Sequence, residues 1–230
     1  MPNLILRTTL IAAAVAALGS CATTQLPQLN PIEMTFFVTS VGPGQGGNLG
    51  GLEGADKHCA ALAKAAGAPD RNWRAYLSTQ APGLRDPNYV NARDRIGAGP
   101  WQNVYGVVVA ANVDELHSPA SKLTKQTALT EKGAVVNGTV DKPNQHDILT
   151  GSRIDGTAFP GPPFPDMTCG NWTKGGADGA AMVGHHDRAG PMMSSSWATS
   201  WNSSHPTIGC NMEKFRATGG EGLFYCFAAQ

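Results

Sequence analysis

The sequence lacks an excess of charge of either sign. Its 230 residues carry 17 basic and 17 acidic side chains, so the formal net charge is zero, and only 15% of residues are charged. A protein that binds nucleic acid through phosphate contacts needs a positive field, so this balance excludes a basic nucleic-acid binder. The Ala-, Glu-, Lys- and Leu-rich periodicity of helical bundles is missing too. With 28 glycines and 16 prolines, the composition favours a single loop-rich domain.

No apolar run is long enough for a transmembrane helix. The longest, residues 8–18 (TTLIAAAVAAL), is shorter than the roughly 20 residues that a bilayer span needs. It follows Arg7 and ends in Leu18-Gly19-Ser20-Cys21, which resembles the bacterial lipobox. We therefore predict a lipoprotein signal peptide over residues 1–21, lipidation of Cys21 and a tether over residues 22–32. Ala22 after the cysteine resembles lipoproteins sorted to the outer membrane, so we expect a lipid-anchored protein of the cell envelope.

The chain also lacks CxxC pairs and the Cys-His spacings of zinc sites. Apart from Cys21 it has four cysteines, Cys59, Cys169, Cys210 and Cys226. An even number in an exported chain favours two disulfides. Three connectivities are open, and counting alone does not choose among them.

Regular secondary structure is predicted mainly in the first half of the chain. Apolar residues at three- and four-residue steps predict a helix over residues 52–66 that ends at Gly67 and buries Cys59. Residues 34–40, 73–78 and 223–228 are typical of strands, and residues 105–110 (YGVVVA) of a fully buried strand. Between about residues 118 and 222 such signals fade. This stretch is either an array of short strands and turns or a disulfide-held functional loop region.

Several blocks of sequence together resemble the endostatin domain of collagens, a variant of the C-type lectin-like fold. They are residues 50–56 (GGLEGAD) with Cys59, 73–78 (WRAYLS), 146–152 (HDILTGS), 168–172 (TCGNW), and Cys210 followed by 223–227 (LFYCF). The blocks occur in order over residues 34–228. The chain also resembles bacterial lipoproteins of endostatin-like or C-type lectin-like type.

The resemblance implies an architecture for residues 33–230. It implies an α+β, C-type lectin-like fold: a small twisted antiparallel sheet, one or two helices and a long disulfide-braced loop region. The first and last strands are expected to be partners. The resemblance also implies the disulfides Cys59–Cys226 and Cys169–Cys210.

The residues that would bind a ligand are less well marked. Trp201-Asn202-Ser203 is similar to the Trp-Asn-Asp run of calcium-dependent lectins, but Ser203 replaces the carboxylate that Ca²⁺ prefers. The nearest likeness to the second calcium motif, Lys142-Pro143-Asn144, has lysine in place of the acid. We therefore expect no cofactor, with bound Ca²⁺ as the alternative. Trp172, Trp197 and Trp201 are candidate stacking platforms for a sugar or residues of the loop core.

A second candidate is the run His185-His186-Asp187, with His205 as a further histidine. Adjacent histidines on a strand point to opposite faces, so only a turn would bring both to one ion. The zinc ligands of endostatin lie largely at its amino terminus, where this chain has no matching histidines, and we predict no metal. A hydrolytic triad with residues 194–196 (SSS) lacks the nucleophile-elbow motif, and no catalytic residue is predicted.

The sequence therefore leads to a non-catalytic binding protein. We expect it to recognise a glycan or an envelope protein through its loop region, with Trp172, Trp201, Asn202, His185, His186 and Asp187 as candidate contacts. One alternative is a metal-assisted hydrolase that uses residues 185–187. Another is a structural envelope lipoprotein with no soluble ligand.

Overall fold

The computed structural model describes residues 27–190, 192 and 194–230. The predicted signal peptide and the lipidation site at Cys21 lie outside the described residues. Of the tether, residues 27–32 are described and follow the domain surface, where the Asn30 amide donates to the Val104 carbonyl at 2.6 Å. Among the described residues, no helix has both the length and the hydropathy of a membrane span.

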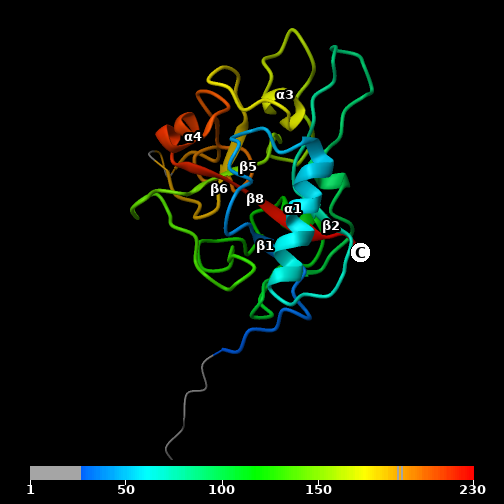
Figure 1. Cartoon of the computed structure of the whole chain (residues 1–230), viewed down its shortest axis with the longest axis vertical. Helices are drawn as coiled ribbons and strands as arrows, with labels where there is room; N and C mark the ends of the chain where they lie inside the picture. The colour runs from blue at the N-terminus through cyan, green and yellow to red at the C-terminus, as the bar shows by residue number, and fades with distance from the viewer. Residues whose placement is uncertain (1–26, 191, 193) are drawn as a thin grey trace, which may run out of the picture.

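The main sheet is built around the last strand. Strand β8 (Gly220–Ala228) pairs antiparallel with β1 (Phe36–Val38) and β2 (Trp73–Ala75), and parallel with β5 (Asp147–Leu149). Strands β6 (Met182–His185) and β7 (His205–Pro206) extend the sheet antiparallel beyond β5, which gives the order β1-β8-β5-β6-β7 with β2 also on β8. Figure 1 shows β8 crossing the middle of the molecule.

This topology confirms one prediction and corrects another. The first and last strands are partners, as expected. The sheet is not purely antiparallel, because β5 and β8 run in the same direction. A parallel pair needs a long crossover. The chain between β5 and β8 supplies one, which contains strands β6 and β7 and two short helices.

The mixed α+β class is confirmed, but the described residues contain more helices than the one or two expected. Helix α1 (Gly51–Ala65) matches the predicted helix, and Gly67 follows it with a positive φ of 85°. The others are α2 (Val113–Leu116), α3 (Cys169–Trp172), α4 (Met212–Thr218) and a 3₁₀ turn (Ala92–Asp94). Three of these, α2, α3 and the 3₁₀ turn, are single turns, too short for an apolar periodicity to develop.

The predicted buried strand over residues 105–110 is only half correct. Strand β4 covers Val108–Ala110 and pairs with β3 (Trp101–Gln102) in a separate two-stranded sheet. Tyr105 and Gly106 form the turn between them, where the Asn103 side chain accepts hydrogen bonds from the amides of Tyr105 and Val107. Val107 is 44% exposed. The apolar run therefore includes turn residues. Hydrophobic periodicity alone does not distinguish such a run from a continuous strand.

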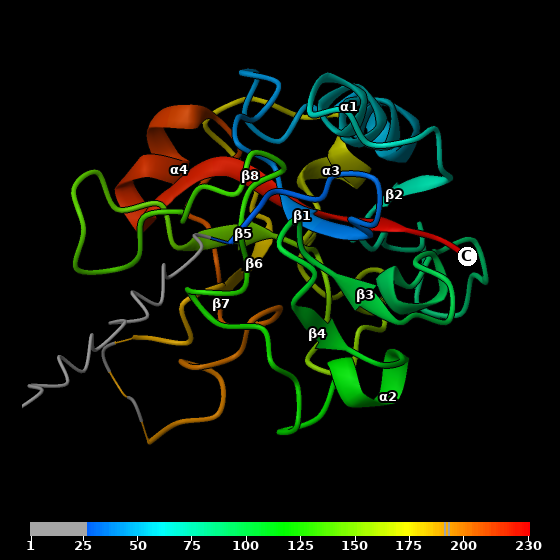
Figure 2. The ribbon, with the colours of Figure 1, turned by 90° about the horizontal axis from the view of Figure 1, so that it is seen from below.

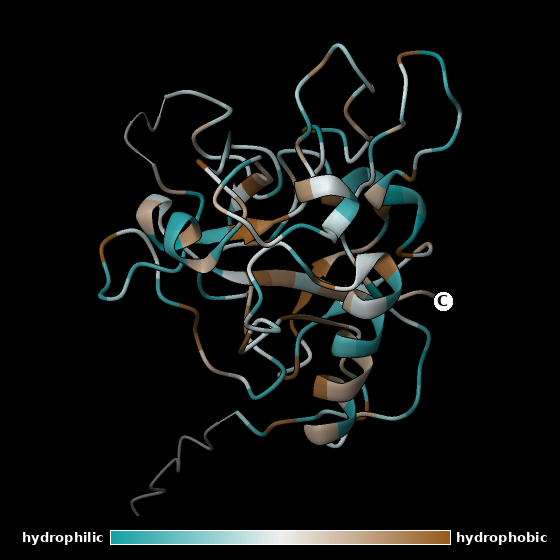
Figure 3. Ribbon diagram, turned by 45° about the horizontal axis from the view of Figure 1, so that its top comes forward, coloured by the Kyte–Doolittle hydropathy of each residue, from teal (hydrophilic) through white to brown (hydrophobic). Residues whose placement is uncertain are grey.

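Two hydrophobic cores lie on opposite faces of the main sheet. Side chains alternate along a strand, so Phe224 and Cys226 join the core beneath α1, whereas Tyr225 and Phe227 join the core shared with β3, β4 and α2. Figure 2 shows these elements on opposite sides of β8. In Figure 3 hydrophobic residues gather on the central strands and hydrophilic ones on many of the surrounding loops. Strand β8 is thus buried on both faces.

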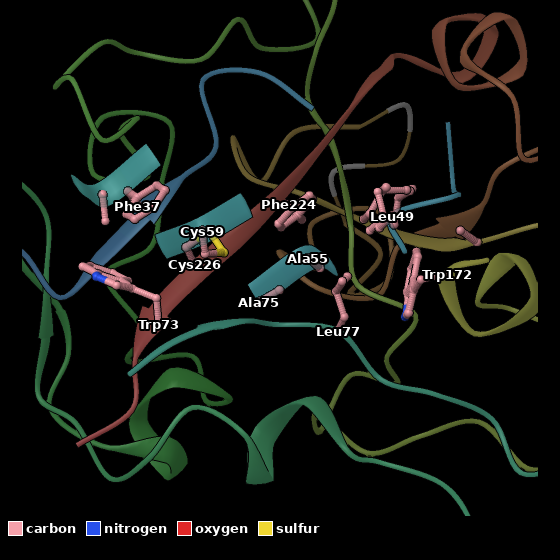
Figure 4. Packing of buried hydrophobic residues seen from close by; sticks show 14 of the residues in the cluster. Phe37, Leu49, Ala55, Cys59, Trp73, Ala75, Leu77, Trp172, Phe224 and Cys226 are labelled. Atoms are coloured by element: carbon pink, nitrogen blue, oxygen red, sulfur yellow. A yellow bond between two sulfur atoms is a disulfide. The ribbon is translucent and has the colours of Figure 1, made fainter. Parts of the chain in front are cut away.

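Both disulfides expected from the resemblance are present. Cys59 of α1 bonds to Cys226 of β8, and Cys169 of α3 bonds to Cys210. Figure 4 shows the first bridge inside the core, between Phe37 and Phe224. It links the longest helix directly to the central strand.

A buried carboxylate reinforces the same junction. Asp56 of α1 accepts hydrogen bonds from the Ala75 amide (2.9 Å), from Arg74 (2.7 Å) and from Arg95 (2.7 and 2.8 Å). The side chains of Asp56 and Arg95 are 11% and 10% exposed. A carboxylate withdrawn from water is costly unless it is paired and hydrogen-bonded, and here both oxygens are used.

Candidate functional site

The candidate contacts Trp172, Trp201 and Asn202 lie inside the fold. Trp172 donates from Nε1 to the Ser78 carbonyl at 2.8 Å, and Trp201 donates to the Leu116 carbonyl at 3.1 Å. The Asn202 amide donates to the Tyr76 hydroxyl and to backbone carbonyls, and its oxygen accepts from Ser200. All three side chains are at most 3% exposed. Trp172 is thus enclosed by the fold, whereas Trp201 and Asn202 also line a small open pocket together with His117 and Arg188.

The candidate His185, by contrast, belongs to a polar cluster at the β5–β6–β7 edge of the sheet, whose strands Figure 2 labels side by side. Asp147 is directly opposite His185 in the β5–β6 register. His205 is opposite Val183 in the β6–β7 register, and so diagonal to His185. Opposite and diagonal residues on one face are within reach of each other. His146, just before β5, stacks its ring on that of His185 at 4.1 Å.

Three glycines allow this close packing. A Cβ on Gly184 would lie 1.9 Å from the Trp201 carbonyl oxygen, so only glycine lets the chain that leads to His205 cross β6. Added Cβ atoms on Gly219 and Gly220 would approach His146 Cδ2 to 3.1 Å and Asp147 Cβ to 3.2 Å. Side chains at these positions would push the cluster apart.

The histidines converge on one carboxylate oxygen. Asp147 Oδ1 lies 3.2 Å from His146 Nε2, 3.3 Å from His185 Nε2 and 3.4 Å from His205 Nε2. These approaches are not well-directed hydrogen bonds: neither Asp147 oxygen has a hydrogen-bond partner among the described residues, and His185 Nε2 has none either. Asp147 and His185 are each 1% exposed. Leaving a buried polar group unsatisfied costs about 1–3 kcal/mol, and more for a charge.

The other ring nitrogen of each histidine faces an acceptor. His185 Nδ1 lies 2.8 Å from the Ala198 carbonyl, and His205 Nδ1 lies 3.1 Å from the Pro206 carbonyl. His146 Nδ1 lies 3.3 Å from Asp187 Oδ1. A carbonyl or carboxylate cannot donate, so these contacts assign the proton to Nδ1 and the lone pair to Nε2 in each neutral ring. All three Nε2 lone pairs are therefore on the side of Asp147.

The pKa values of the cluster residues are shifted by their neighbours. Burial alone would raise the pKa of Asp147, but the neighbouring His185 and His205 outweigh it and hold that pKa below its usual value. The Asp147 carboxylate in turn raises the pKa of His205. Burial would also raise the pKa of Asp187, yet the contact with His146 and the Thr139 and Ala189 amides lower it well below its usual range. Both carboxylates are thus held ionised beside the histidines.

The run 185–187 is divided, as alternation along a strand predicts. His186 is turned away from His185, and its Nε2 lies 3.1 Å from the Asn137 carbonyl. Asp187 accepts from the Thr139 amide and reaches the cluster only through His146. Among the described residues, no hydrogen bond or ion pair joins residues 194–196 to His185, His186 or Asp187. The structure brings together His185 and His205 but not a serine-based triad.

A separate feature of the loop region is an open cleft of about 380 Å³. Its walls are two segments far apart in sequence, residues 81–91 and 153–161, which form neighbouring loops on the side of α3 in Figure 1. The Ala158 amide donates to Asn91 Oδ1, and the Arg93 amide donates to the Gly156 carbonyl. These bonds fix the walls to each other. The polar and aromatic lining residues are Asp86, Tyr89, Asn91, Arg153, Asp155, Thr157 and Phe159.

Sequence reasoning missed His146 and Asp147 as members of the cluster and missed Tyr89 and Asp155 in the cleft. The histidine-aspartate pair was visible within residues 146–152, but its relation to His185 depends on the strand register, 38 positions along the chain. The only local signal was the accumulation of histidine in a chain that has six. The cleft has no sequence signal, because its walls meet through tertiary hydrogen bonds.

Comparison with known proteins does not assign either site. No protein-family model matches the chain, and no curated protein matches it. The residues of the two sites and their geometry are therefore the basis for any functional assignment.

Proposed function

We propose that this chain is a non-catalytic recognition protein of the bacterial cell envelope, whose C-type lectin-like, endostatin-like domain binds a glycan through its loop region. The α+β class, the pairing of the first and last strands and the two disulfides are all compatible with that fold. Anchorage through a lipid on Cys21 is part of the proposal.

The observation that carries the proposal is the cleft between residues 81–91 and 153–161. Its volume of about 380 Å³ is in the range of small-ligand sites. Tyr89 is 48% exposed and offers a ring face for the apolar face of a sugar. Asp86 and Asp155 supply acceptors for hydroxyl groups, and Arg153 supplies donors. A glycan needs this combination of a flat apolar surface and fixed polar groups.

The hydrolase alternative has weaker support. It requires a nucleophile or an activated water beside a base, with room for a substrate. The histidines at the β5–β7 edge are largely buried around Asp147, and the cleft lining residues do not include them. Binding without turnover is therefore the function that the geometry favours.

Glycan-array binding followed by titration tests the proposal. We expect the wild-type protein to bind a defined glycan, and Tyr89→Ala and Asp155→Asn to weaken that binding at least tenfold. Trp197→Ala is the matched control, since Trp197 is a 42% exposed aromatic residue of the loop region that does not line the cleft. Absence of glycan binding, or equal losses in all three variants, would refute the cleft as the site, and capture of only an envelope protein would favour the protein ligand instead.

The envelope anchor is tested separately. Cys21→Ser is expected to abolish acyl labelling and release the protein from the membrane fraction. Unchanged labelling would refute lipidation at this cysteine and leave the cleft proposal intact.

A further inference from the structure

We propose that His146, Asp147, His185 and His205 form a binding site for one divalent transition-metal ion, with Zn²⁺ as the representative ion. The inference is independent of the glycan cleft. It rests on the positions and hydrogen bonds of the four side chains.

The first argument is the spacing of the donor atoms. Two donors on a tetrahedral Zn²⁺ ion, with bonds of about 2.0–2.1 Å, lie about 3.3–3.4 Å apart. The three distances from Asp147 Oδ1 to the histidine nitrogens are 3.2, 3.3 and 3.4 Å. One donor atom each of His146, Asp147 and His185 also lies within 4.8 Å of the other two. The three distances to Asp147 Oδ1 are thus those of ligands that share an ion, and His205 joins the other three ligands through its distance to Asp147 alone.

The second argument is the direction of the donor atoms. Groups that hydrogen-bond to each other point at each other, whereas ligands of one ion point at a position between them. Asp147 lacks a hydrogen-bond partner at both oxygens, and His185 lacks one at Nε2, although the atoms are 3.3 Å apart and buried. In an ion-free cluster with neutral rings, the Nε2 lone pairs would face the lone pairs of a carboxylate, which is repulsive unless the histidines take up protons. A cation between them removes the repulsion.

Each of the three histidines also has an acceptor at its other ring nitrogen. Metal-binding histidines usually donate their other N–H to a carbonyl or carboxylate, which fixes the tautomer and orients the ring. His185 and His205 each have a carbonyl acceptor at Nδ1, and His146 has Asp187. Asp187 is itself held by the amides of Thr139 and Ala189. All three histidines have this support.

Loading requires one local change. The rings of His146 and His185 are stacked, with an angle of 16° between their planes, so their lone pairs run nearly parallel. His185 is fixed by the shorter contact, 2.8 Å to the Ala198 carbonyl, while His146 lies 3.3 Å from Asp187. We infer that His146 turns about its side-chain torsions when the ion enters.

The donor set defines the class of ion. Imidazole nitrogen suits Zn²⁺, Cu²⁺, Ni²⁺ and Fe²⁺, whereas Ca²⁺ takes six to eight oxygen ligands. Four protein ligands close a tetrahedral shell, as in structural rather than catalytic zinc sites. The ion would join three strands, β5, β6 and β7, at the sheet edge that no disulfide reaches.

The test is metal titration of the purified protein after removal of bound metal with EDTA. At pH 7.5 we expect one Zn²⁺ per chain by calorimetry, and a Co²⁺-loaded protein with the intense visible absorption of tetrahedral coordination. His205→Ala and Asp147→Asn are expected to weaken Zn²⁺ binding at least 10- to 100-fold. His205 is the variant of choice, since its side chain is 29% exposed and its removal leaves the core intact.

His58→Ala is the matched control, since His58 of α1 contacts the Val41 carbonyl and the Phe224 ring and is not one of the histidines around Asp147. It should bind Zn²⁺ like the wild type. Circular dichroism checks that each variant is folded. No Zn²⁺ binding by the folded wild type, or equal affinity in the wild type and His205→Ala, would overturn the proposal. NMR can detect protons on the Nε2 atoms. If these protons are present and no metal binds, the cluster is a set of imidazolium–carboxylate pairs and the proposal is wrong.

Discussion

Two buried aspartates have opposite surroundings. Asp56, where α1 meets β2, accepts hydrogen bonds from two arginines and a backbone amide. Asp147, where β5 meets β6, has three histidine nitrogens within 3.4 Å but no hydrogen-bond partner among the described residues. The first carboxylate is fully hydrogen-bonded by the protein, whereas the second has only histidine nitrogens around it. We infer from this difference that Asp56 stabilises the fold, whereas Asp147 is available to bind a ligand.

The largest expected effect concerns the bridge beside Asp56. Replacing both partners of Cys59–Cys226 by alanine should lower the free energy of unfolding by up to about 5 kcal/mol, because the bridge closes a loop of 167 residues in the unfolded chain. Urea denaturation measures the change. The second bridge spans 41 residues and provides the control, with an expected loss about 1 kcal/mol smaller. A larger loss from the second bridge would show that loop closure does not dominate.

Asp56→Asn should give the next largest effect. The change keeps the shape of the side chain but leaves Arg95 buried without its counter-charge, at a cost of about 3–5 kcal/mol. Burial already lowers the pKa of Arg95, which shows how unfavourable its charge is without Asp56. Urea denaturation at pH 7 is again the measurement. A decrease in the free energy of unfolding of less than about 1 kcal/mol would show that Asp56 does not stabilise the fold in the way proposed.

The same substitution at Asp147 should have the opposite sign. In EDTA at pH 8, an amide at position 147 can donate to Nε2 lone pairs that the carboxylate cannot satisfy. With the histidine rings neutral, Asp147→Asn should therefore raise the stability of the metal-free protein by about 1–2 kcal/mol. At lower pH, where protonated histidines donate to the carboxylate, this gain should disappear. Added Zn²⁺ should raise the melting temperature of the wild type and leave that of the variant unchanged. Destabilisation of the metal-free variant would show that Asp147 is satisfied without an ion.

The two regions also differ in what the sequence could predict. Helix α1 follows from apolar residues at helical spacing and from Gly67, and β8 follows from a continuous aromatic and apolar run. The disulfide pairing came from family resemblance. The parallel β5–β8 pair and the turn at Tyr105 did not follow, because strand direction and turn position depend on tertiary contacts. The Asp147 cluster was missed for the same reason: only the β5–β6 register places His185 opposite Asp147.

His117 gives the smallest effect and supplies a reference for the cluster histidines. Both of its nitrogens are partnered, Nδ1 with the Val113 carbonyl and Nε2 with the Tyr76 hydroxyl, each at 2.7 Å. Burial lowers its pKa below the usual 6.5. A histidine with a depressed folded-state pKa contributes stability above about pH 6.5, and that contribution is lost as the pH falls through the folded-state value.

Unfolding measured in EDTA between pH 8 and pH 5 should therefore show a smaller decrease in stability for His117→Gln than for the wild type. NMR titration should place the midpoint of the His117 ring below 6.5 and be insensitive to Zn²⁺. The ring signals of His185 and His205 should instead change when Zn²⁺ is added. An equally strong response of the His117 signals to Zn²⁺ would contradict this prediction. It would show that an unpartnered Nε2 does not distinguish the metal-binding histidines from a histidine of the core.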